Sequence, residues 1–579
     1  MADTFRINPK LQKAKIALAK YGYALYKPYQ EQGVEWLLRR EATTKKDGTP
    51  KKKPYGGFIC DEMGLGKTIQ MISLIMANPL PNTLLVLPAS LISQWVQEFS
   101  KFAPEMKIVI HHGEERVIHS KEITERDLNQ PIVWITSYSL FRGIHGIPTV
   151  FQRIYWDRVI VEECHYFRNP KSGISRTIMK IKSNIKWGIT GTPIQNRMLD
   201  LYTLFRFLGI KAHTVKDNLE FIKTKFILRR TKDMVKHFNS KLALPPSTVQ
   251  VVNTSFKSTQ ELNLYKKVYG EVRQQLDVFR KFDFSQIHIL ELILRLRQAS
   301  ILPQLVLDGY SKKFKTDTVQ WKYTNSKLDN VVRHLRLDNN IKGGVETNIL
   351  EGGYDFQMDI KKPKRLNILP SNHTIKTSNS SIHHPIHHSI DKAIEHQIDD
   401  AIDEAIDDDI DEAIDDEDET DIGSDDVVDG DEVKIGENNR TIIFTNFKIE
   451  LDYLYNTLTR MGYRVHTISG DKSLDDRAAV ISKCHIDDVK SNEFVDILLV
   501  QIYAGGTGLN LYMFNHVYFT SPTWNPALEM QAIARAHRIG QKKDVLVKKF
   551  VLNSKNISTI DKRILDVQEA KFDIIQLLY

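Results

Sequence analysis

The stretch Asp61-Glu-Met-Gly-Leu-Gly-Lys-Thr68 decides the fold. It follows an apolar run at 57–60 and opens a helical pattern at 67–77, which the pair Asn78-Pro79 ends. Its two glycines permit a tight turn whose backbone N–H groups point at phosphate oxygens, and the following helix adds its positive N-terminal end. A strand, this turn and a helix in that order predict an α/β domain with a phosphate-binding loop.

The loop supplies the residues that are expected to contact a nucleotide. Lys67 should reach the β- and γ-phosphates, and the hydroxyl of Thr68 should bind Mg²⁺. The strict phosphate-loop pattern has glycine where Asp61 stands, so the local match is imperfect. The position of the loop between a predicted strand and a predicted helix nevertheless supports its assignment as a phosphate loop. The other residues expected to line the nucleotide are Glu62, Met63, Gly64, Leu65 and Gly66.

Strand and helix patterns alternate from about residue 24 to residue 235. The apolar runs that resemble buried strands are 57–60, 84–87, 132–135, 158–161 and 187–190. A capping box at 258–261 begins a helical region that extends to residue 300. The alternation then returns, with strand candidates at 441–444, 464–467, 496–500, 516–519 and 545–548.

This alternation predicts an α/β protein with two mainly parallel sheets. The expected parts are an N-terminal nucleotide-binding domain at 1–235, a helical insertion at 236–339, a low-complexity linker at 340–437 and a second α/β domain at 438–579. The linker is first His-rich and then acidic, with isoleucine at every fourth position from 398 to 414. A metal-binding histidine box, a solvated helix and a histone-binding segment are alternatives to the disorder that such a composition favours.

Charge is distributed unevenly along the chain. The net charge of the 579 residues is +8, but residues 391–432 hold 22 acidic residues and one lysine. Without that stretch, 79 basic and 50 acidic residues remain, a net charge of +29. Such a basic remainder suits a polyanionic partner, most simply nucleic acid, although a lysine-rich solvated surface is an equally simple explanation.

Several protein classes do not fit this sequence. The first residues contain no secretory apolar stretch, and no run approaches the roughly 18 apolar residues of a membrane span. The three cysteines, Cys60, Cys164 and Cys484, are too scattered for a disulfide framework or a CxxC zinc site. A soluble, intracellular protein in a reducing compartment is therefore expected.

Two acidic residues follow a second apolar strand candidate, in the run Val159-Ile-Val-Glu-Glu-Cys-His165. Carboxylates at the end of a parallel strand lie at the carboxyl edge of the sheet, beside the phosphate loop. Glu162 is expected to hold Mg²⁺ and Glu163 to orient the attacking water. Two solvated acids at a strand end are the alternative, and the position about 95 residues after the phosphate loop argues against it.

A third strand candidate leads into the run 190–196, TGTPIQN. Hydroxyl groups in such a turn can sense the nucleotide and signal to the other domain, although an ordinary turn has the same local features. The residues assigned to this coupling are His165, Thr190, Gly191 and Thr192.

The run 531–541, QAIARAHRIGQ, lies far along the chain from the phosphate loop. Arg535 and Arg538 offer planar, always-charged donors for a γ-phosphate in transit, and Gln531 joins them as an expected catalytic residue. These arginines could also form a basic helix face with Lys542, and only the phosphate loop in the same chain favours the catalytic interpretation.

Taken in order, these motifs resemble the Swi/Snf-like family of DNA translocases within helicase superfamily two. The resemblance covers roughly 20–335 and 438–560. It includes 25–37 (LYKPYQEQGVEWL), where Gln30 is the implied adenine reader, 61–68, and 228–232 (LRRTK). The run 294–299 (LRLRQA) is similar to the branch related to DNA repair, whose members often carry a RING zinc domain between the lobes. No cysteine lies between Cys164 and Cys484, so that ubiquitin-ligase route is not expected.

The resemblance implies two RecA-like lobes that close on ATP and Mg²⁺ and move along double-stranded DNA, usually without separating its strands. Contacts in the family go mainly to the phosphate backbone, so binding should be weakly sequence-specific and strongly salt-dependent. The residues implied to contact DNA are Ser90, Trp95, Thr136, Ser137, Gly505, Gly506, Asn510 and Trp524.

Two alternatives to this function stay open. One is a strand-separating helicase that acts on DNA or RNA, and the other is a degenerate ATPase that serves as a nucleotide-gated DNA-binding scaffold. The expected partners are double-stranded DNA and nucleosomes or other DNA-bound proteins, with a monomer and no membrane association. The family implies a nuclear location, and the Asn-, Ile- and Lys-rich composition also suits a protein of a large DNA virus, in a viral factory or virion.

One departure from the family generates a prediction, because the family has aspartate where Glu162 stands. The extra methylene moves the carboxylate by about a C–C bond length, and positioning errors near 1 Å cost about 10²-fold in rate. We expect slow but measurable steady-state ATP hydrolysis, to be compared with Glu162→Asp in the presence and absence of duplex DNA. A large gain in the variant identifies a compromised natural site, and no hydrolysis by either protein rejects the motor interpretation.

Overall fold

The computed structural model describes residues 8–26, 28–44, 49–113, 131–141, 149–191, 193, 198–235, 238, 244–282, 287–314, 317, 319–338, 439–486, 488, 491, 494–505, 509–538, 540–555 and 557–576. The predicted linker at 340–437 lies outside these residues. The chain divides into two compact units, which are described separately below. One unit comprises Met1–Ser255, Asn330–Asn339 and Asp425–Tyr579, and the other comprises Phe256–Asp329 and Asn340–Ser424.

The larger unit contains two parallel sheets, and the first is built from the N-terminal part of the chain. Its strand order is β3 (Lys107–His111), β4 (Ile132–Ser137), β2 (Asn82–Leu87), β5 (Tyr155–Glu162), β6 (Lys182–Ile189), β1 (Tyr55–Ile59), β7 (Ile227–Leu228). Every neighbouring pair among these described strands is parallel. Parallel strands need crossover connections, which accounts for the helix between most of them.

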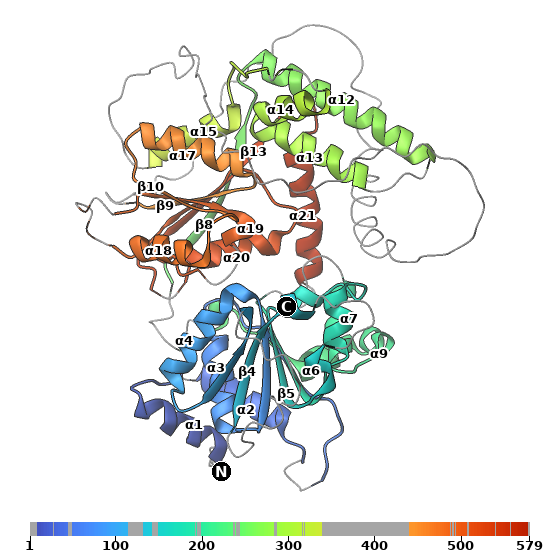
Figure 1. Ribbon diagram of the computed structural model, residues 1–579, viewed down its shortest axis with the longest axis vertical. Helices are drawn as coiled ribbons and strands as arrows, with labels where there is room; N and C mark the ends of the chain where they lie inside the picture. Colours follow the sequence, from blue (N-terminus) through green and yellow to red (C-terminus); the bar gives the residue numbers. More distant parts are fainter. Residues whose placement is uncertain are drawn as a thin grey trace. The chain divides into compact units, whose positions relative to one another are not determined.

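Helices cover both faces of this sheet, as Figure 1 shows for α1, α3 and α4 on one side and α6, α7 and α9 on the other. The first group is α1 (Pro9–Lys20), α2 (Tyr29–Glu41), α3 (Lys67–Ala77) and α4 (Ile92–Phe102); the second is α6 (Val150–Arg153), α7 (Gly173–Met179), α8 (Met198–Phe207), α9 (Ala212–Asp217) and α10 (Leu219–Phe226). Leu84 and Val86 of β2 face one core while Leu85 and Leu87 face the other. A strand buried on both faces is continuously apolar, which is the pattern that the sequence displays.

The five apolar runs predicted as strands all lie in this sheet, and the helix predicted at 67–77 has these bounds as α3. Strands β3 and β7 were not predicted. The edge strand β3 has Lys107 and three half-buried residues, so it lacks a clear apolar run, and β7 has only two residues. Short or half-exposed edge strands carry too little pattern to be recognised from sequence.

The second sheet has the strand order β10 (Val465–Ile468), β11 (Ile497–Gln501), β9 (Thr441–Thr445), β12 (His516–Phe519), β13 (Val545–Leu552), β8 (Ser247–Thr254). The described strand pairs of this sheet are also parallel. Its helices are α17 (Lys448–Arg460), α18 (Leu474–Cys484), α19 (Ile502–Gly505), α20 (Pro526–Ala536) and α21 (Ile560–Gln576). The two-lobed α/β fold predicted from the sequence is therefore present.

One predicted boundary differs from the structure. Residues 236–339 were expected to form a helical insertion, but Ser247–Thr254 is strand β8, paired along its full length with β13. Its sequence, STVQVVNT, is β-branched and mostly exposed, so it shows neither the apolar run of a buried strand nor a helical period. The pairing partner lies about 300 residues away in the chain, and only the tertiary structure brings the two together.

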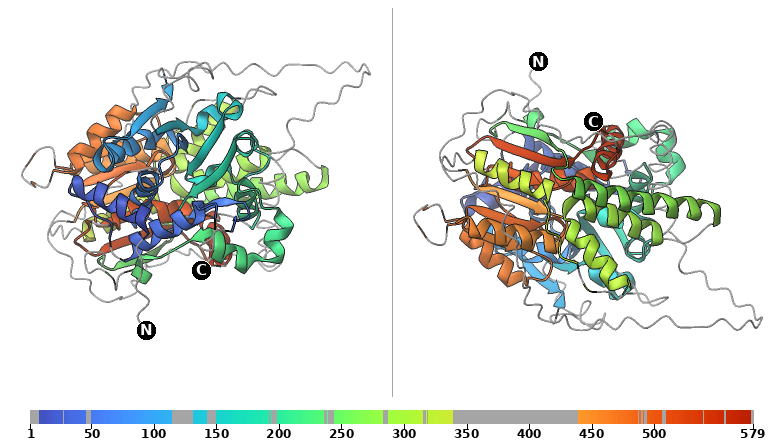
Figure 2. Two further views of the ribbon diagram at one scale, coloured as in Figure 1. Left: turned by 90° about the horizontal axis from the view of Figure 1, so that it is seen from below. Right: turned by 90° about the horizontal axis from the view of Figure 1, so that it is seen from above.

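The smaller unit is helical, as predicted for this part of the chain. It contains α12 (Thr259–Phe282), α13 (Ile287–Ile301), α14 (Pro303–Phe314) and the start of α15 (Ser326–Asp338), and Figure 2 shows α12 to α14 side by side. The predicted capping box is half formed: the N–H of Glu261 donates to Ser258 Oγ at 3.2 Å, but its carboxylate accepts hydrogen bonds from Ser326 and Thr324. Burial raises the pKa of Glu261 to about 7.

Within the described residues, no helix is both long and apolar enough to cross a membrane.

A buried ion pair ties helix α2 to the middle of the first sheet. Arg158 of β5 donates from Nε and Nη2 to the two carboxylate oxygens of Glu41, each at 2.6 Å. Trp187 Nε1 donates to the same carboxylate at 2.9 Å, and Asn78 Nδ2 donates to it at 2.7 Å. The side chains of Arg158 and Glu41 are 0% and 1% exposed, so each charge depends on the other. Removing one member would leave a buried charge without its counter-ion.

We expect Glu41→Gln to lower the free energy of unfolding of this lobe by about 3–5 kcal/mol, the cost of leaving a buried charge unpaired. For a lobe of this size the midpoint of thermal unfolding, followed by tryptophan fluorescence, should fall by about 10 °C. The matched control is Glu35→Gln, whose carboxylate pairs with exposed Arg39 in the same helix. That change should cost about 1 kcal/mol or less, and equal effects of the two variants would contradict the assignment.

Candidate functional site

The residues singled out by the sequence gather along one edge of the first sheet. The phosphate loop follows β1, Ser90 follows β2, Ser137 ends β4, Glu162 ends β5 and Thr190 follows β6. Because all of these strands are parallel, their carboxyl ends meet at the same edge. Segments up to 130 residues apart in the chain thus contribute to one site.

The phosphate loop has the backbone conformation that its glycines predict. Gly64 and Gly66 have φ angles of +91° and +76°, in the left-handed region that other residues rarely adopt. A Cβ atom at Gly66 would lie 2.4 Å from the amide nitrogen of Gln30. Helix α3 begins directly afterwards at Lys67, so its free N–H groups face the loop. This arrangement suits an anion at the helix N-terminus.

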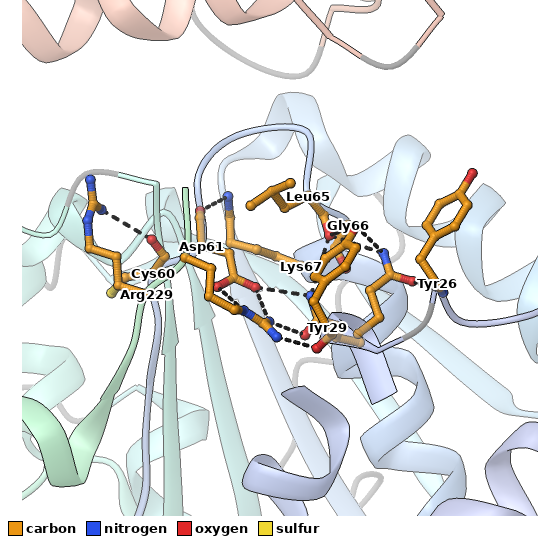
Figure 3. Close-up of polar contacts among 11 residues, drawn as sticks. Tyr26, Tyr29, Cys60, Asp61, Leu65, Gly66, Lys67 and Arg229 are labelled. Atoms are coloured by element: carbon orange, nitrogen blue, oxygen red, sulfur yellow. Dashed lines mark hydrogen bonds and ion pairs between the residues drawn. The ribbon is translucent and has the colours of Figure 1, made fainter. Parts of the chain in front are cut away.

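Helix α2 brings the expected adenine reader against the same loop, as Figure 3 shows for Tyr29, Leu65 and Gly66. Gln30 Nε2 donates to the carbonyl of Leu65 at 3.1 Å, and the hydroxyl of Tyr29 donates to that carbonyl at 3.1 Å. The backbone N–H of Tyr26 donates to Gln30 Oε1 at 2.9 Å, which fixes the orientation of the amide. Gln30 therefore lies next to the phosphate loop.

Lys67 folds back over its own loop. Its Nζ donates to the backbone carbonyl of Asp61 at 2.8 Å, a contact drawn in Figure 3. Gly191, two residues after the end of β6, lies beside it, since a Cβ atom there would be 3.7 Å from Lys67 Nζ and 3.0 Å from Met63. The lysine thus stands between the phosphate loop and the turn that the sequence assigned to coupling.

Glu162 is nine-tenths buried at the end of β5, and burial raises its pKa well above the ordinary value; the charge of Glu163 adds to this effect and that of Lys67 opposes it. Within the described part of the chain, its Oε2 is buried without a hydrogen-bond partner. A buried carboxylate oxygen without a donor suits a hard cation, and Mg²⁺ takes oxygen ligands. Glu162 and the hydroxyl of Thr68 therefore fit the predicted Mg²⁺ site, with phosphate and water oxygens as further ligands.

Glu163 has a different environment from its neighbour. It is a non-glycine residue in the left-handed region, with φ +49°, and its Oε2 lies 3.2 Å from His165 Nδ1 and 3.4 Å from Thr190 Oγ1. Burial acts to raise the pKa of Glu163, but the hydrogen bond from His165 and the charges of His165, Lys67 and Arg535 together lower it. Glu163 thus favours its ionised form, while the adjacent Glu162 favours its protonated form. Two carboxylates with opposed pKa shifts are typical of a catalytic site.

His165 and Thr190 link the acidic strand end to the next strand. His165 Nδ1 lies 3.3 Å from Thr190 Oγ1, and both contact the carboxylate of Glu163. Two of the residues assigned to coupling are therefore joined through a catalytic candidate, and Gly191 is close to Lys67. The fourth, Thr192, lies outside the described residues.

The arginine block forms the end of α20 and the turn that follows it. Arg535 is half-buried, which lowers its pKa to about 10, and the charge of Glu163 acts in the opposite direction. Burial also lowers the pKa of Arg538, whose Nη1 donates to the carbonyl of Leu509 at 3.5 Å. Gln531 is buried in α20. Both sheets belong to one compact unit, and in it Lys232 Nζ donates to the carbonyl of His537 at 2.8 Å.

Two predicted DNA contacts of the first lobe belong instead to its core. The ring of Trp95 in α4 is 2% exposed and packs in the apolar cluster under the sheet. Thr136 is fully buried, and its hydroxyl donates to the carbonyl of His111 at 3.1 Å. Both side chains satisfy packing or hydrogen bonds inside the protein, so neither is placed to touch a ligand. A sequence motif predicts which segment contacts a ligand, but not which way each side chain points.

The remaining predicted DNA contacts lie at loops or element ends. Ser137 ends β4 but is buried, at 1% exposed, with its Oγ 2.9 Å from His112 Nδ1 and 2.6 Å from Ser139 Oγ, while Ser90 lies in the turn after β2. In the second lobe, Gly505 ends α19, while Asn510 and Trp524 are half-buried in loops. Gly506 lies outside the described residues.

Sequence reasoning missed the side chains that support the phosphate loop. Arg229 and Arg230 were part of a recognised motif but were given no role. Arg229 Nη1 donates to the carbonyls of Cys60 and Gly191, at 3.2 and 3.1 Å, the first of which Figure 3 shows. The available signal was Asp61, because an acid in place of a loop glycine needs a basic partner when it is buried.

Comparison with known proteins gives two family matches. Residues 29–218 match the SNF2-related domain, and residues 427–540 match the helicase conserved C-terminal domain. Together these matches span more than half of the chain.

Similar curated proteins include DNA repair protein RAD5B of Arabidopsis thaliana, 28% identical over 90% of this chain and 45% of its own length. DNA repair protein rad8 of Schizosaccharomyces pombe is 27% identical over 90% of this chain and 52% of its own length. The chain thus spans about half the length of the curated relatives it matches. A solved structure titled Sulfolobus solfataricus SWI2/SNF2 ATPase core in complex with dsDNA is 20% identical, with a TM-score of 0.33 and coverage of 96% of this chain and 95% of that chain.

The contrast between the two acids generates a prediction. We expect Glu163→Gln to leave the dissociation constant for a fluorescent ATP analogue within about twofold, because the phosphate loop is untouched, while removal of a general base lowers hydrolysis by about 10²-fold or more. The control is Glu105→Gln, an exposed acid of the same lobe that pairs with Lys20. Hydrolysis by Glu163→Gln at the parent rate would show that Glu163 does not orient the attacking water.

Proposed function

Because the chain belongs to the SNF2 family of helicase-related proteins, we propose that it is an ATP-dependent translocase on double-stranded DNA. It hydrolyses ATP between its two parallel-sheet lobes, moves along the duplex and remodels or displaces bound proteins. The substrate and the cofactor are ATP and Mg²⁺.

The observation that carries this proposal is the convergence of a phosphate loop and an opposed pair of carboxylates at one sheet edge. The left-handed glycines and the start of α3 suit the phosphates, while Glu162 and Glu163 end the strand two positions away in the sheet. Phosphoryl transfer needs little covalent chemistry from a protein, so positioning and charge stabilisation account for most of the rate. Each of those requirements has a candidate residue here.

The roles follow from the surroundings of each side chain. Gln30 orients the adenine, and Lys67, held by its hydrogen bond to the carbonyl of Asp61, binds the β- and γ-phosphates. Glu162 and Thr68 hold Mg²⁺, which neutralises charge on the phosphates when it is bound. Ionised Glu163 accepts a proton from the attacking water, and His165 and Thr190 hold its carboxylate in place.

Arg535 and Arg538 supply positive charge for the γ-phosphate from the second lobe, and Gln531 belongs to the same segment. A Cβ atom at Gly64 would lie 3.8 Å from Arg538 Cβ, which supports this role because it places the arginine segment beside the phosphate loop. Since each lobe then holds part of the nucleotide, binding and hydrolysis change how the lobes are held together. His165, Thr190, Gly191 and Thr192 pass this change towards the DNA-contacting loops.

Double-stranded DNA is the proposed track, contacted by loops that include Ser90, Gly505, Asn510 and Trp524. The net charge of +29 outside residues 391–432 supports a polyanionic partner. Two of the similar proteins are described as DNA repair proteins, which supports DNA as the substrate and a nuclear location or, for a virus-encoded protein, a viral factory. Nucleosomes and other DNA-bound proteins are the proposed targets.

A second candidate is a nucleotide-gated DNA-binding scaffold that does not turn over. Glu162 favours it, because the Swi/Snf-like family has aspartate at this position and the extra methylene moves the carboxylate by about a C–C bond length. Nucleotide-dependent DNA affinity without hydrolysis would identify this scaffold. Separation of the strands of a DNA or RNA duplex would instead identify a helicase.

Translocation can be tested by triplex displacement. We expect the protein to release a third strand from duplex DNA only when ATP and Mg²⁺ are present, because movement along the duplex removes whatever is bound in its path. Lys67→Ala should abolish release, since the phosphates then lose their main cation, while leaving DNA binding without nucleotide within about twofold.

Release of the third strand by Lys67→Ala at the parent rate would contradict the assignment of the nucleotide site. ATP hydrolysis by the parent that is stimulated by duplex DNA, but without release, would reject translocation and leave the ATPase. The measurement should be repeated at two salt concentrations, because phosphate contacts make DNA affinity fall steeply with salt.

A further inference from the structure

The guanidinium group of Arg230 joins several segments around the phosphate loop. Arg230 follows strand β7, and its Nε donates to Asp61 Oδ1 at 2.9 Å. Its Nη2 donates to Asp61 Oδ2 and, at 2.8 Å, to Gln70 Oε1 of helix α3. Its Nη1 donates to the backbone carbonyl of Tyr29 in helix α2. One side chain thus bridges α2, the phosphate loop and α3.

Asp61 transmits this bridge to Lys67. Its carboxylate is held by Arg230 and by Gln70 Nε2 at 3.2 Å, and its backbone carbonyl accepts the hydrogen bond from Lys67 Nζ. The side chain of Asp61 is 0% exposed and that of Arg230 is 12% exposed, so water does not replace either partner. The position of the carbonyl that orients Lys67 therefore depends on an ion pair with a residue 169 positions away.

The backbone of the same segment reinforces the bridge. The N–H of Glu62 donates to the carbonyl of Arg230 at 2.8 Å, and the N–H of Cys60 donates to the carbonyl of Leu228 at 2.7 Å. Asp61 lies between these two hydrogen bonds. The loop thus continues the pairing of β1 with β7 beyond the ends of both strands.

Space for the bridge comes from a glycine in helix α2. A Cβ atom at Gly33 would lie 1.9 Å from Gln70 Oε1 and 2.8 Å from Arg230 Nη2. Any other residue at this position must therefore displace Gln70 and press on the guanidinium. Gly33 is one turn from Tyr29 and Gln30, so the adenine-reading segment and the loop approach each other through this contact.

We propose that Arg230 is a positioning residue for the nucleoside triphosphate. Through Asp61 it places the ammonium group of Lys67 for the phosphates, and through the carbonyl of Tyr29 it places Gln30 for the base. This inference rests on the proposed ATP site and assigns a role in it to the segment after β7. Lysine cannot replace Arg230 fully, because an ammonium group cannot make the same planar, two-point contact with a carboxylate.

The test measures ATP and GTP binding with fluorescent analogues in the full chain. We expect Arg230→Gln to raise the dissociation constant for ATP about tenfold or more and to reduce the preference for ATP over GTP. Arg230→Lys should give an intermediate value. Gly33→Ala, which keeps every residue of the bridge but displaces the side chain of Gln70, should raise the constant about three- to fivefold.

Two variants serve as matched controls. Asp496→Asn removes an equally two-pointed pair, in which Arg464 donates from Nε and Nη2 to Asp496 at 2.8 Å each, in the second sheet. Gly270→Ala adds a methyl group to a helical glycine that has nothing within 4 Å of its Cβ position. Both should bind ATP with the parent's dissociation constant.

The stoichiometry of binding separates positioning from stability. A purely structural ion pair would reduce the fraction of protein that binds while leaving the dissociation constant of that fraction unchanged, and this result for Arg230→Lys and Gly33→Ala would overturn the proposal. A parent chain that binds no ATP would overturn the proposed function together with this inference. A parent that binds ATP, with variants that bind it equally well, would overturn the inference alone.

Discussion

The constraint on which the rest of the structure depends is the parallel direction of the strands in each sheet. Parallel strands place their carboxyl ends at one edge, and the phosphate loop, Glu162, Glu163 and Thr190 all lie at that edge of the first sheet. The same constraint requires crossover helices on both faces, so the central strands are buried on both sides and read as continuous apolar runs. The parallel direction of the strands therefore explains both where the site lies and why the strands can be predicted from the sequence.

At that edge, the surroundings of two adjacent glutamates, Glu162 and Glu163, shift their pKa values in opposite directions. Glu162 is buried and the adjacent Glu163 is half-buried. Burial raises the pKa of Glu162, whereas for Glu163 the effect of burial is outweighed by the hydrogen bond from His165 and nearby positive charges, which together lower its pKa. The backbone separates them, because the left-handed conformation of Glu163 turns its side chain towards His165 and Thr190. A site that holds a cation on one carboxylate and activates water with the next requires this difference.

The loop that would hold the phosphates is itself supported from outside. Asp61 departs from the strict glycine pattern, and the departure is explained by Arg230, which neutralises its buried charge. The Arg158–Glu41 pair performs the corresponding task further down the sheet, where it fastens α2 to β5. Helix α2 is thus held at its C-terminal end by the ion pair of Glu41 and at its N-terminal end by the hydrogen bond to the carbonyl of Tyr29. Gln30 follows Tyr29 directly in this helix.

The sequence by itself determined the two parallel-sheet lobes, the helices between them, the phosphate loop and the adjacent carboxylates, because these depend on local patterns of burial and on glycine conformation. It did not reveal strand β8, the buried positions of Trp95 and Thr136, or the partners of Asp61. Those features depend on contacts between segments far apart in the chain: β8 pairs with β13 about 300 residues away, and Asp61 with Arg230 169 residues away. Pairing at such separations leaves no periodic signal in either segment, so only the tertiary structure could decide it.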